Sequence, residues 1–292
     1  MCSQINKRQH LADKNLIFRD GWTIAEQSFQ PDQMITTGSN FMIGNGYLGY
    51  RGTFEEWGKQ EYVACIVTDT YDTADGKWNE LCNVPNGLYM SVQTGGQPII
   101  LATGKVSHYE RCLNLHNGLF KRSLVWRSDN EEVSLSFEKF ASMAQLNTLA
   151  LSCEIVPQGD MELEVVSGID GDVWSLNGDH FQSISLAVEK GCLISRCITR
   201  ELHTEIIVAE GIQVIGATVS ASRIAREANK ILRHLTLQGK AGQPIRIIKF
   251  AEIRHTNETT TPQEDALGAL ASNLKKGYSQ IKAAHEEKWR KI

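Results

Sequence analysis

The sequence predicts an all-β protein: a large two-sheet antiparallel β-sandwich with a C-terminal linker helix. Short apolar segments rich in β-branched and aromatic residues recur at intervals of roughly 8–12 residues. Turn signals such as Asn177-Gly178-Asp179 separate these segments. Helical periodicity is concentrated after residue 261, so no βαβ alternation is present. This combination favours an antiparallel sandwich over a parallel sheet.

The expected strands follow one another along most of the chain. Residues 223–232 are ambiguous, because Ile224, Ala228 and Ile231 also fit one face of a short helix. The predicted strands are residues 64–67, 88–92, 98–101, 119–126, 133–137, 148–156, 162–166, 183–188, 193–199, 204–208, 213–219, 234–237 and 245–253.

A helix is predicted from Pro262 toward Ile292. Thr261 supplies an N-cap hydroxyl, Pro262 suits the first helical position, and Glu264 is placed to complete a capping box. We therefore divide the chain into a sandwich domain, residues 1–260, and the start of a helical linker, residues 261–292. An apolar stripe runs along the helix through Leu267, Leu270, Leu274, Tyr278, Ile281 and Trp289, and its first half is expected to cover the sandwich.

Composition excludes several classes of function. The 292 residues are 41% hydrophobic, enough for a large core, and the net charge of -4 gives no basic patch for nucleic acid or an anionic membrane. The first fourteen residues lack the apolar core of a signal peptide, and no apolar run is long enough to span a bilayer. Seven scattered cysteines indicate reduced thiols, without the spacing of a metal site. A cytoplasmic protein without nucleic-acid or membrane partners is predicted.

Residues 44–56 combine four glycines with polar side chains that are able to line a site. Glycine at this density indicates tight turns or the close approach of another surface. Glu55 and Glu56 would point to opposite faces of a strand, so they make a poor pair for glycoside cleavage. We interpret the stretch as a turn at the rim of the sandwich, locked by Arg51 with Glu55 or Glu56. Its candidate barrel-facing or sugar-proximal residues are Asn45, Tyr47, Arg51, Glu55 and Glu56.

Two further segments carry clustered polar residues. Residues 69–79 are expected to form a loop between strands, in which Asp72 and Trp78 are sugar-proximal candidates, although a solvated loop is the commoner outcome for such composition. Asp170 and Asp172 are expected to accept hydrogen bonds from backbone N–H groups in a turn, because two carboxylates fall short of a calcium site. No metal site is predicted.

A dinucleotide-binding function is one alternative. Gly44-x-Gly46-x-x-Gly49 matches the Rossmann fingerprint, and Asp69 lies twenty residues beyond Gly49. The match lacks its context, because no helical pattern begins at Gly49. A stand-alone carbohydrate-binding or assembly module is a second alternative.

Several motifs in register resemble the N-terminal domain of glycoside hydrolase family 65, the maltose, trehalose and kojibiose phosphorylases. The resemblance extends from about Trp22 to Trp289. The motifs are residues 44–56, Asn83-Val84-Pro85-Asn86, Tyr109-Glu110-Arg111-Cys112-Leu113-Asn114-Leu115 with Gly118-Leu119, Phe140-Ala141-Ser142 and Ser167-Gly168-Ile169-Asp170-Gly171.

The resemblance implies a supersandwich, similar to that of galactose mutarotase, that supports an α/α barrel. In that family the barrel follows a helical linker and holds the general acid and the phosphate-binding residues. The enzymes cleave α-linked glucose disaccharides with inorganic phosphate as co-substrate, or in some members with water, and need no cofactor. We expect this chain to end in the linker, to contain no catalytic residue and to lack phosphorolytic activity alone. Its expected partners are the barrel and, through it, the disaccharide; a homodimer is left open.

Overall fold

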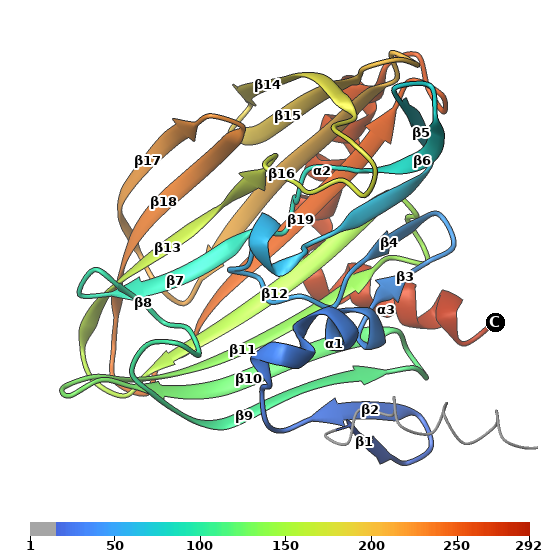
Figure 1. Ribbon diagram of the computed structural model, residues 1–292. Coiled ribbons are helices and arrows are strands. Elements are labelled where there is room, and N and C mark those ends of the chain that lie inside the picture. The colour runs from blue at the N-terminus through green and yellow to red at the C-terminus, as the bar shows by residue number, and fades with distance from the viewer. Residues whose placement is uncertain (1–15) are drawn as a thin grey trace, which may run out of the picture.

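The computed structural model describes residues 16–292 and confirms the all-β prediction (Figure 1). Its largest sheet is antiparallel and ten-stranded, with non-sequential neighbours at its centre. In spatial order its strands are β1 (Leu16–Arg19), β2 (Thr23–Glu26), β9 (Lys105–Asn114), β10 (Leu119–Arg127), β11 (Glu132–Ala141), β12 (Thr148–Pro157), β19 (Ile245–His255), β16 (Glu205–Ile215), β15 (Cys192–Thr199) and β14 (Phe181–Glu189).

Two smaller antiparallel sheets form the second layer. A short helix, α1 (Met34–Asn40), and two 3-10 turns, Pro31–Gln33 and Lys59–Glu61, accompany them. The five-stranded sheet has the order β17 (Val219–Glu227), β18 (Lys230–Gly239), β13 (Met161–Asp170), β7 (Met90–Thr94) and β8 (Gln97–Pro98). The four-stranded sheet has the order β3 (Ile43–Gly44), β4 (Leu48–Tyr50), β5 (Cys65–Ala74) and β6 (Trp78–Asn83).

The period-2 alternation of the strands separates two cores. On β12, Leu149 and Leu151 face the second layer, where they join Val165 of β13 and Tyr50 of β4 in the main core. Ala150 points to the opposite face and belongs to a smaller core under the C-terminal helices. The ten-stranded sheet is therefore buried on both faces along its middle strands, which explains apolar runs such as residues 149–151 on β12 and 206–209 on β16.

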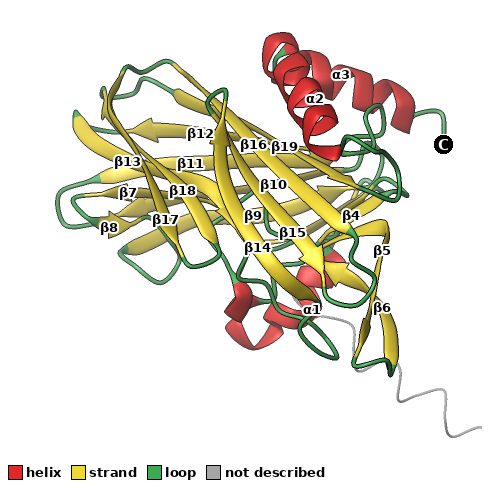
Figure 2. Cartoon of the chain, turned by 90° about the horizontal axis from the view of Figure 1, so that it is seen from above, coloured by secondary structure: helices red, strands yellow, loops and turns green. Residues whose placement is uncertain are grey.

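Two helices cover the outer face of the ten-stranded sheet, α2 (Pro262–Lys276) and α3 (Tyr278–Trp289) (Figure 2). The predicted helix starts at Pro262 as expected, but the prediction of one continuous helix is wrong. Gly277 separates the two helices with φ +79° and ψ 162°, a conformation almost restricted to glycine. The predicted capping box is also wrong, because Thr261 makes no side-chain cap, and Thr259 Oγ1 instead donates to Asp265 Oδ2 at 2.5 Å.

The strand predictions differ from the structure in a few places. The helical alternative for residues 223–232 is wrong, since they form the hairpin of β17 and β18. The segments 204–208 and 213–219 mostly belong to one strand, β16, and only Gln97–Pro98 is extended in the region predicted at 98–101. The strands β1, β2, β6 and β9 escaped prediction, and in β9 charged and polar residues interrupt the apolar positions.

The described residues contain six of the seven cysteines. Six cysteines of residues 16–292 are free thiols and five of them are buried, whereas Cys2 lies outside the described residues. Burial raises the pKa of Cys65, Cys82 and Cys197 to about 12, so these thiols are inert. Among the described helices, none is long and apolar enough to cross a membrane.

Candidate functional site

The β3–β4 hairpin is fixed to the sandwich by Asn45. Its Nδ2 donates to the carbonyl oxygens of Ser142 and Leu146 at 2.8 and 2.9 Å, and its Oδ1 accepts from the N–H groups of Tyr47 and Leu48. All of the hydrogen-bonding capacity of Asn45 is thus used within the fold. Tyr47 stacks on His255, with ring centroids 6.2 Å apart and planes 7° apart, and burial raises the pKa of its phenol.

Arg51 is buried and does not pair with either glutamate, so the predicted lock between Arg51 and Glu55 or Glu56 is wrong. Its guanidinium donates to the carbonyl oxygen of Tyr62 at 2.8 Å and to that of Ile35. It lies directly against Gly38, where an added Cβ would be 2.8 Å from Arg51 Nη2. Arg51 therefore joins α1 to the segment before β5.

Glu55 and Glu56 lie on a turn, and both reach Arg122 on β10, so the prediction that they face opposite sides is wrong. Glu56 receives two parallel hydrogen bonds, at 2.8 Å from Nη1 and 2.5 Å from Nη2. Glu55 lies 2.8 Å from Arg122 Nη2 and 2.9 Å from Lys139 Nζ on β11. A bidentate guanidinium contact fixes a carboxylate in orientation as well as position.

A second ion pair extends this group into an inner ion network: Glu26, Glu55, Glu56, Arg111, Arg122 and Lys139. Arg111 of β9 is the cross-strand partner of Arg122 and contacts Glu26 at 2.9 Å. Arg111 and Lys139 also donate to the carbonyl oxygens of Gly52 and Thr53, at 3.2 and 2.5 Å. Three cations of the large sheet thus bind three carboxylates and the backbone of the turn, which neutralises charges that are expensive to bury alone.

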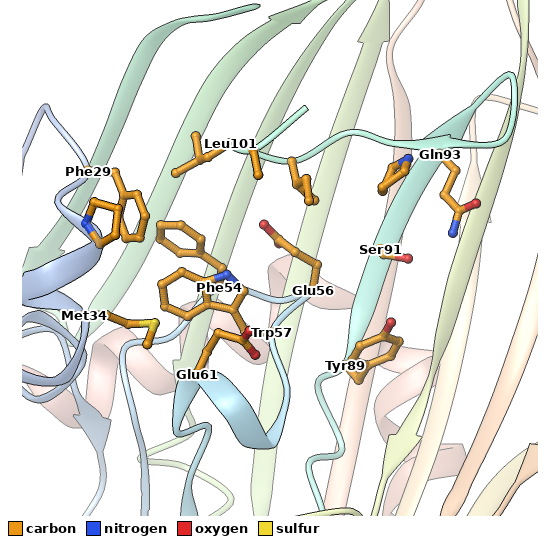
Figure 3. Close-up of a pocket in the computed structure, with 14 residues that line it drawn as sticks. Phe29, Met34, Phe54, Glu56, Trp57, Glu61, Tyr89, Ser91, Gln93 and Leu101 are labelled. Carbon is orange, nitrogen blue, oxygen red and sulfur yellow. The ribbon is translucent and has the colours of Figure 1, made fainter. Parts of the chain in front are cut away.

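Beside the turn lies a cavity of about 620 Å³, here called the front cavity. Phe29, Phe54 and Trp57 form an aromatic wall on one side, with ring centroids 4.0 to 5.7 Å apart. On the opposite side Figure 3 shows Ser91 and Gln93 of β7, and Tyr89 directly before this strand. Glu56 lies between the two sides. Of the seven residues named as candidates from the sequence, Glu56 alone lines this cavity.

Asp72 and Trp78 lie elsewhere, on the β5–β6 hairpin, so the predicted loop at residues 69–79 is wrong except at its tip. Asp72 is buried and accepts hydrogen bonds from the N–H groups of Glu201 and Leu202 at 3.1 and 2.9 Å. Trp78 is 61% exposed. Asp72 therefore fixes a neighbouring loop, and Trp78 presents an indole to solvent.

A second cavity of about 650 Å³, here called the end cavity, lies where α3 ends. It brings Gly44, Asn45 and Gly46 next to Trp22, Leu115 and Met143, together with Trp289 and Arg290. The indole Nε1 of Trp289 donates to the carbonyl oxygen of Leu115 at 3.0 Å. The glycine-rich hairpin thus forms one side of an apolar hollow, whose Trp22 and Leu115 are 55% and 43% exposed.

The structure does not support the dinucleotide alternative. Gly49 lies within β4, which pairs with β5, and among residues 16–292 no helix begins at these glycines. The turn predicted at Asp170 and Asp172 is confirmed only in part. Asp170, the last residue of β13, accepts from Asp172 N through Oδ1 at 2.9 Å, and its Oδ2 lies 2.8 Å from Lys230 Nζ. Asp172 Oδ1 instead lies 3.2 Å from Lys59 Nζ.

Sequence reasoning missed most of the front cavity. Trp57 and Phe54 directly flank Glu55 and Glu56, and this alternation of aromatic and acidic residues is visible in the sequence. Tyr89, Ser91 and Gln93 recur at a spacing of two around a predicted strand, which places them on one face. No sequence pattern marks Phe29 as a cavity residue, because it comes close to Phe54 only in the folded chain.

Comparison with known proteins matches this chain to one family of carbohydrate-active enzymes. The family model for the N-terminal domain of glycosyl hydrolase family 65 matches residues 24–292. The 1,2-alpha-glucosylglycerol phosphorylase of Bacillus selenitireducens is 35% identical over 96% of the chain, and the nigerose phosphorylase of Lachnoclostridium phytofermentans is 26% identical over 93%. The chain spans 36% and 39% of the lengths of these two relatives.

A solved structure described as a putative kojibiose phosphorylase from human microbiome superposes with a TM-score of 0.83 at 14% identity. The superposition covers 94% of this chain and 38% of the other, and supports the fold. The family model carries the assignment: the chain belongs to glycosyl hydrolase family 65, as its N-terminal domain.

Proposed function

We propose that this chain is the non-catalytic N-terminal domain of an α-glucoside phosphorylase and that it supports a catalytic α/α barrel. The observation that carries the proposal is the match to the N-terminal domain model over residues 24–292, in a chain that spans 36% and 39% of two relatives named as phosphorylases. The substrate would be an α-linked glucoside, inorganic phosphate the co-substrate, and no cofactor would take part.

The chemistry of the turn supports a non-catalytic role. Inverting cleavage of a glycoside needs one carboxyl group as acid and another as base, roughly 6.5–9.5 Å apart across the bond. Glu55 and Glu56 are instead both bound to Arg122, and Glu55 is completely buried. Arg122 and Lys139 hold the pKa of Glu55 below its ordinary value despite the opposing effect of burial, so it would not act as a proton donor near neutral pH.

The end cavity supports a docking role for the barrel. It lies beside the end of α3 and exposes Trp22 and Leu115, two apolar side chains that would gain by burial. The Gly44–Gly46 hairpin offers a surface without bulky side chains, so another backbone is able to approach closely. We include a contribution to homodimer contacts and a cytoplasmic location in the proposal.

Reconstitution tests this function. The chain alone, incubated with phosphate and kojibiose, nigerose, trehalose or 2-O-α-glucosylglycerol, is expected to release no glucose 1-phosphate. Mixing it with the separately expressed remainder of the Bacillus selenitireducens relative is expected to raise turnover above that of the remainder alone. Trp22→Asp should weaken this gain, whereas Trp78→Asp, on the exposed β6, should not.

Two results would contradict the proposal. Phosphorolysis by the purified chain would show that it carries catalytic groups of its own. No gain in turnover or in stability of the remainder upon mixing would remove the supporting role.

A further inference from the structure

The front cavity has the dimensions of a small-molecule site. Its volume of about 620 Å³ lies within the range of roughly 300–1,000 Å³ that is usual for ligand pockets. The catalytic machinery of the proposed function does not account for it, and its lining combines a group of aromatic rings with a few polar groups. We propose that the front cavity binds a neutral saccharide, a short α-glucosyl chain.

The aromatic wall supplies the apolar part of such a site. Phe54 packs on Trp57 with ring centroids 4.0 Å apart, and Phe29 lies 5.4 Å from Phe54 and 5.7 Å from Trp57. Phe54 is also held over Arg122, whose guanidinium carbon is 4.3 Å from its ring centroid. The wall is therefore fixed before any ligand arrives, which lowers the entropic cost of binding. Phe54 is 1% exposed and backs the wall, so the half-buried rings of Phe29 and Trp57 face the cavity. A pyranose ring presents an apolar face of C–H groups suited to these two rings.

The polar groups supply oriented hydrogen-bond acceptors. Glu56 is held by two hydrogen bonds from Arg122, at 2.8 and 2.5 Å, and a carboxylate has lone pairs beyond the two that these occupy. Glu61 Oε2 accepts from the N–H group of Gly58 at 2.9 Å, which holds the second carboxylate in place. Gln93 and Ser91, across the cavity on β7, add groups that both donate and accept. Sugar hydroxyls match this mixture of fixed acceptors and amphoteric groups.

Charge discriminates between classes of saccharide. Glu56 and Glu61 line the front cavity, and the lining residues identified in chain 16–292 include no Lys, Arg or His. The nearby guanidinium of Arg122 is 1% exposed and already bound to Glu55 and Glu56. A phosphate group would therefore meet two carboxylates without a compensating cation. The site fits a neutral saccharide and disfavours a sugar phosphate.

The inference rests on the proposed function, since membership of a carbohydrate-active family makes a saccharide the relevant polyol. The test measures the binding of maltose, kojibiose and maltotriose to the 292-residue chain. Binding is monitored by tryptophan fluorescence and by calorimetry. Saturable binding is expected. Gln93→Ala, which removes a polar partner, and Ala102→Trp, which fills the cavity from its exposed rim, should each weaken binding about tenfold or more.

Two controls separate binding from folding. Trp78→Ala removes an exposed indole on β6 and should leave the affinity unchanged. Each variant is checked by its thermal unfolding midpoint, and Gln93→Ala and Ala102→Trp avoid the buried aromatic residues whose truncation endangers the fold. Glucose 1-phosphate should bind at least about tenfold more weakly than the neutral sugars.

The proposal is overturned if no saccharide gives saturation up to about 50 mM, if Gln93→Ala and Ala102→Trp bind as the unaltered chain does, or if glucose 1-phosphate binds as well as maltose. Turnover in the reconstitution experiment is measured separately from saccharide binding, so the two proposals can fail separately. Restored turnover without saccharide binding removes this inference alone, and saccharide binding without restored turnover removes the supporting role alone.

Discussion

The two faces of the ten-stranded sheet each bury a glutamate, but they neutralise it in different ways. On the inner face Glu55 lies between Arg122 and Lys139, at 2.8 and 2.9 Å. On the outer face Glu252 of β19 lies under α2, where Thr148 Oγ1 and Asn273 Nδ2 donate to its Oε1 at 2.6 and 2.7 Å. One carboxyl group is therefore matched by charge, and the other by neutral hydrogen bonds.

The two carboxyl groups consequently titrate in opposite directions. Burial disfavours the ionised form of Glu55, but Lys139 and Arg122 outweigh burial and hold its pKa below the ordinary value. Burial dominates at Glu252 and raises its pKa to about 7, against the smaller opposing effects of Thr148, Arg254 and Asn273. Its second oxygen, Oε2, has no hydrogen-bond partner within residues 16–292, which also favours the protonated form.

Each face of the sheet is joined to its covering layer in its own way. The inner turn is attached by permanent charges that also orient Glu56 toward the front cavity. The outer helix is attached by apolar packing and by a carboxyl group that is mostly neutral below about pH 7. We therefore expect pH to act on the two attachments in opposite ways.

The largest expected effect is that of Glu55→Gln. The substitution leaves Lys139 and Arg122 buried with one counter-charge fewer, so the free energy of unfolding should fall by about 3–5 kcal/mol at pH 7. Because the folded pKa of Glu55 is lowered, its stabilising contribution is present above the unfolded value of 4.5 and is lost as pH falls through the folded value. The loss should therefore shrink on acidification, as measured by urea unfolding between pH 3 and 8.

Glu132→Gln is the matched control for Glu55→Gln. Glu132 pairs with Arg127 at 2.5 Å, but both side chains are partly exposed, so the change should cost less than about 1 kcal/mol. Equal costs for the two substitutions would show that burial of the inner network adds nothing to its contribution.

Glu252→Gln should have an effect of opposite sign. The raised pKa means that the contribution of the protonated carboxyl is fully present below pH 4.5 and is lost as pH rises through about 7. A rise from 4.5 to about 7 corresponds to about 3 kcal/mol. Because glutamine stays neutral, the variant should match the unaltered chain near pH 4.5 and exceed its stability by up to about 3 kcal/mol at pH 8.

A stability difference between Glu252→Gln and the unaltered chain that does not change with pH would contradict the raised pKa of Glu252. Thr148→Val is a useful companion variant, because it removes one hydrogen bond to the carboxyl while keeping the volume of the side chain. It should destabilise the chain at every pH, and by more at alkaline than at acidic pH, because the hydrogen bond from Thr148 lowers the pKa of Glu252.

The sequence predicts the fold better than it predicts the sites. Strand alternation and turn signals identify the sandwich because they reflect local geometry, and Pro262 marks the start of α2 for the same reason. The partners of Glu55 lie 67 and 84 residues away on β10 and β11, at Arg122 and Lys139, so no local pattern identifies them. Arg51 was misassigned because nearby carboxylates are visible in a sequence, whereas the carbonyl oxygens that it binds depend on the tertiary fold.

The smallest expected effects concern the helical layer itself and separate its packing from the inner network. Gly277→Ala places a Cβ on a residue with φ +79°, which should cost about 1–3 kcal/mol and loosen the join between α2 and α3. Gly268→Ala lies in the exposed middle of α2, where an added Cβ meets no atom within 4 Å, and should stabilise by about 0.5–1 kcal/mol. The thermal unfolding midpoint should fall in Gly277→Ala and rise in Gly268→Ala. If the effect of Glu55→Gln on the free energy of unfolding keeps the same pH dependence in both variants, the two faces act independently. A change in that pH dependence in either variant would show instead that the outer helices and the inner network are coupled through the sheet.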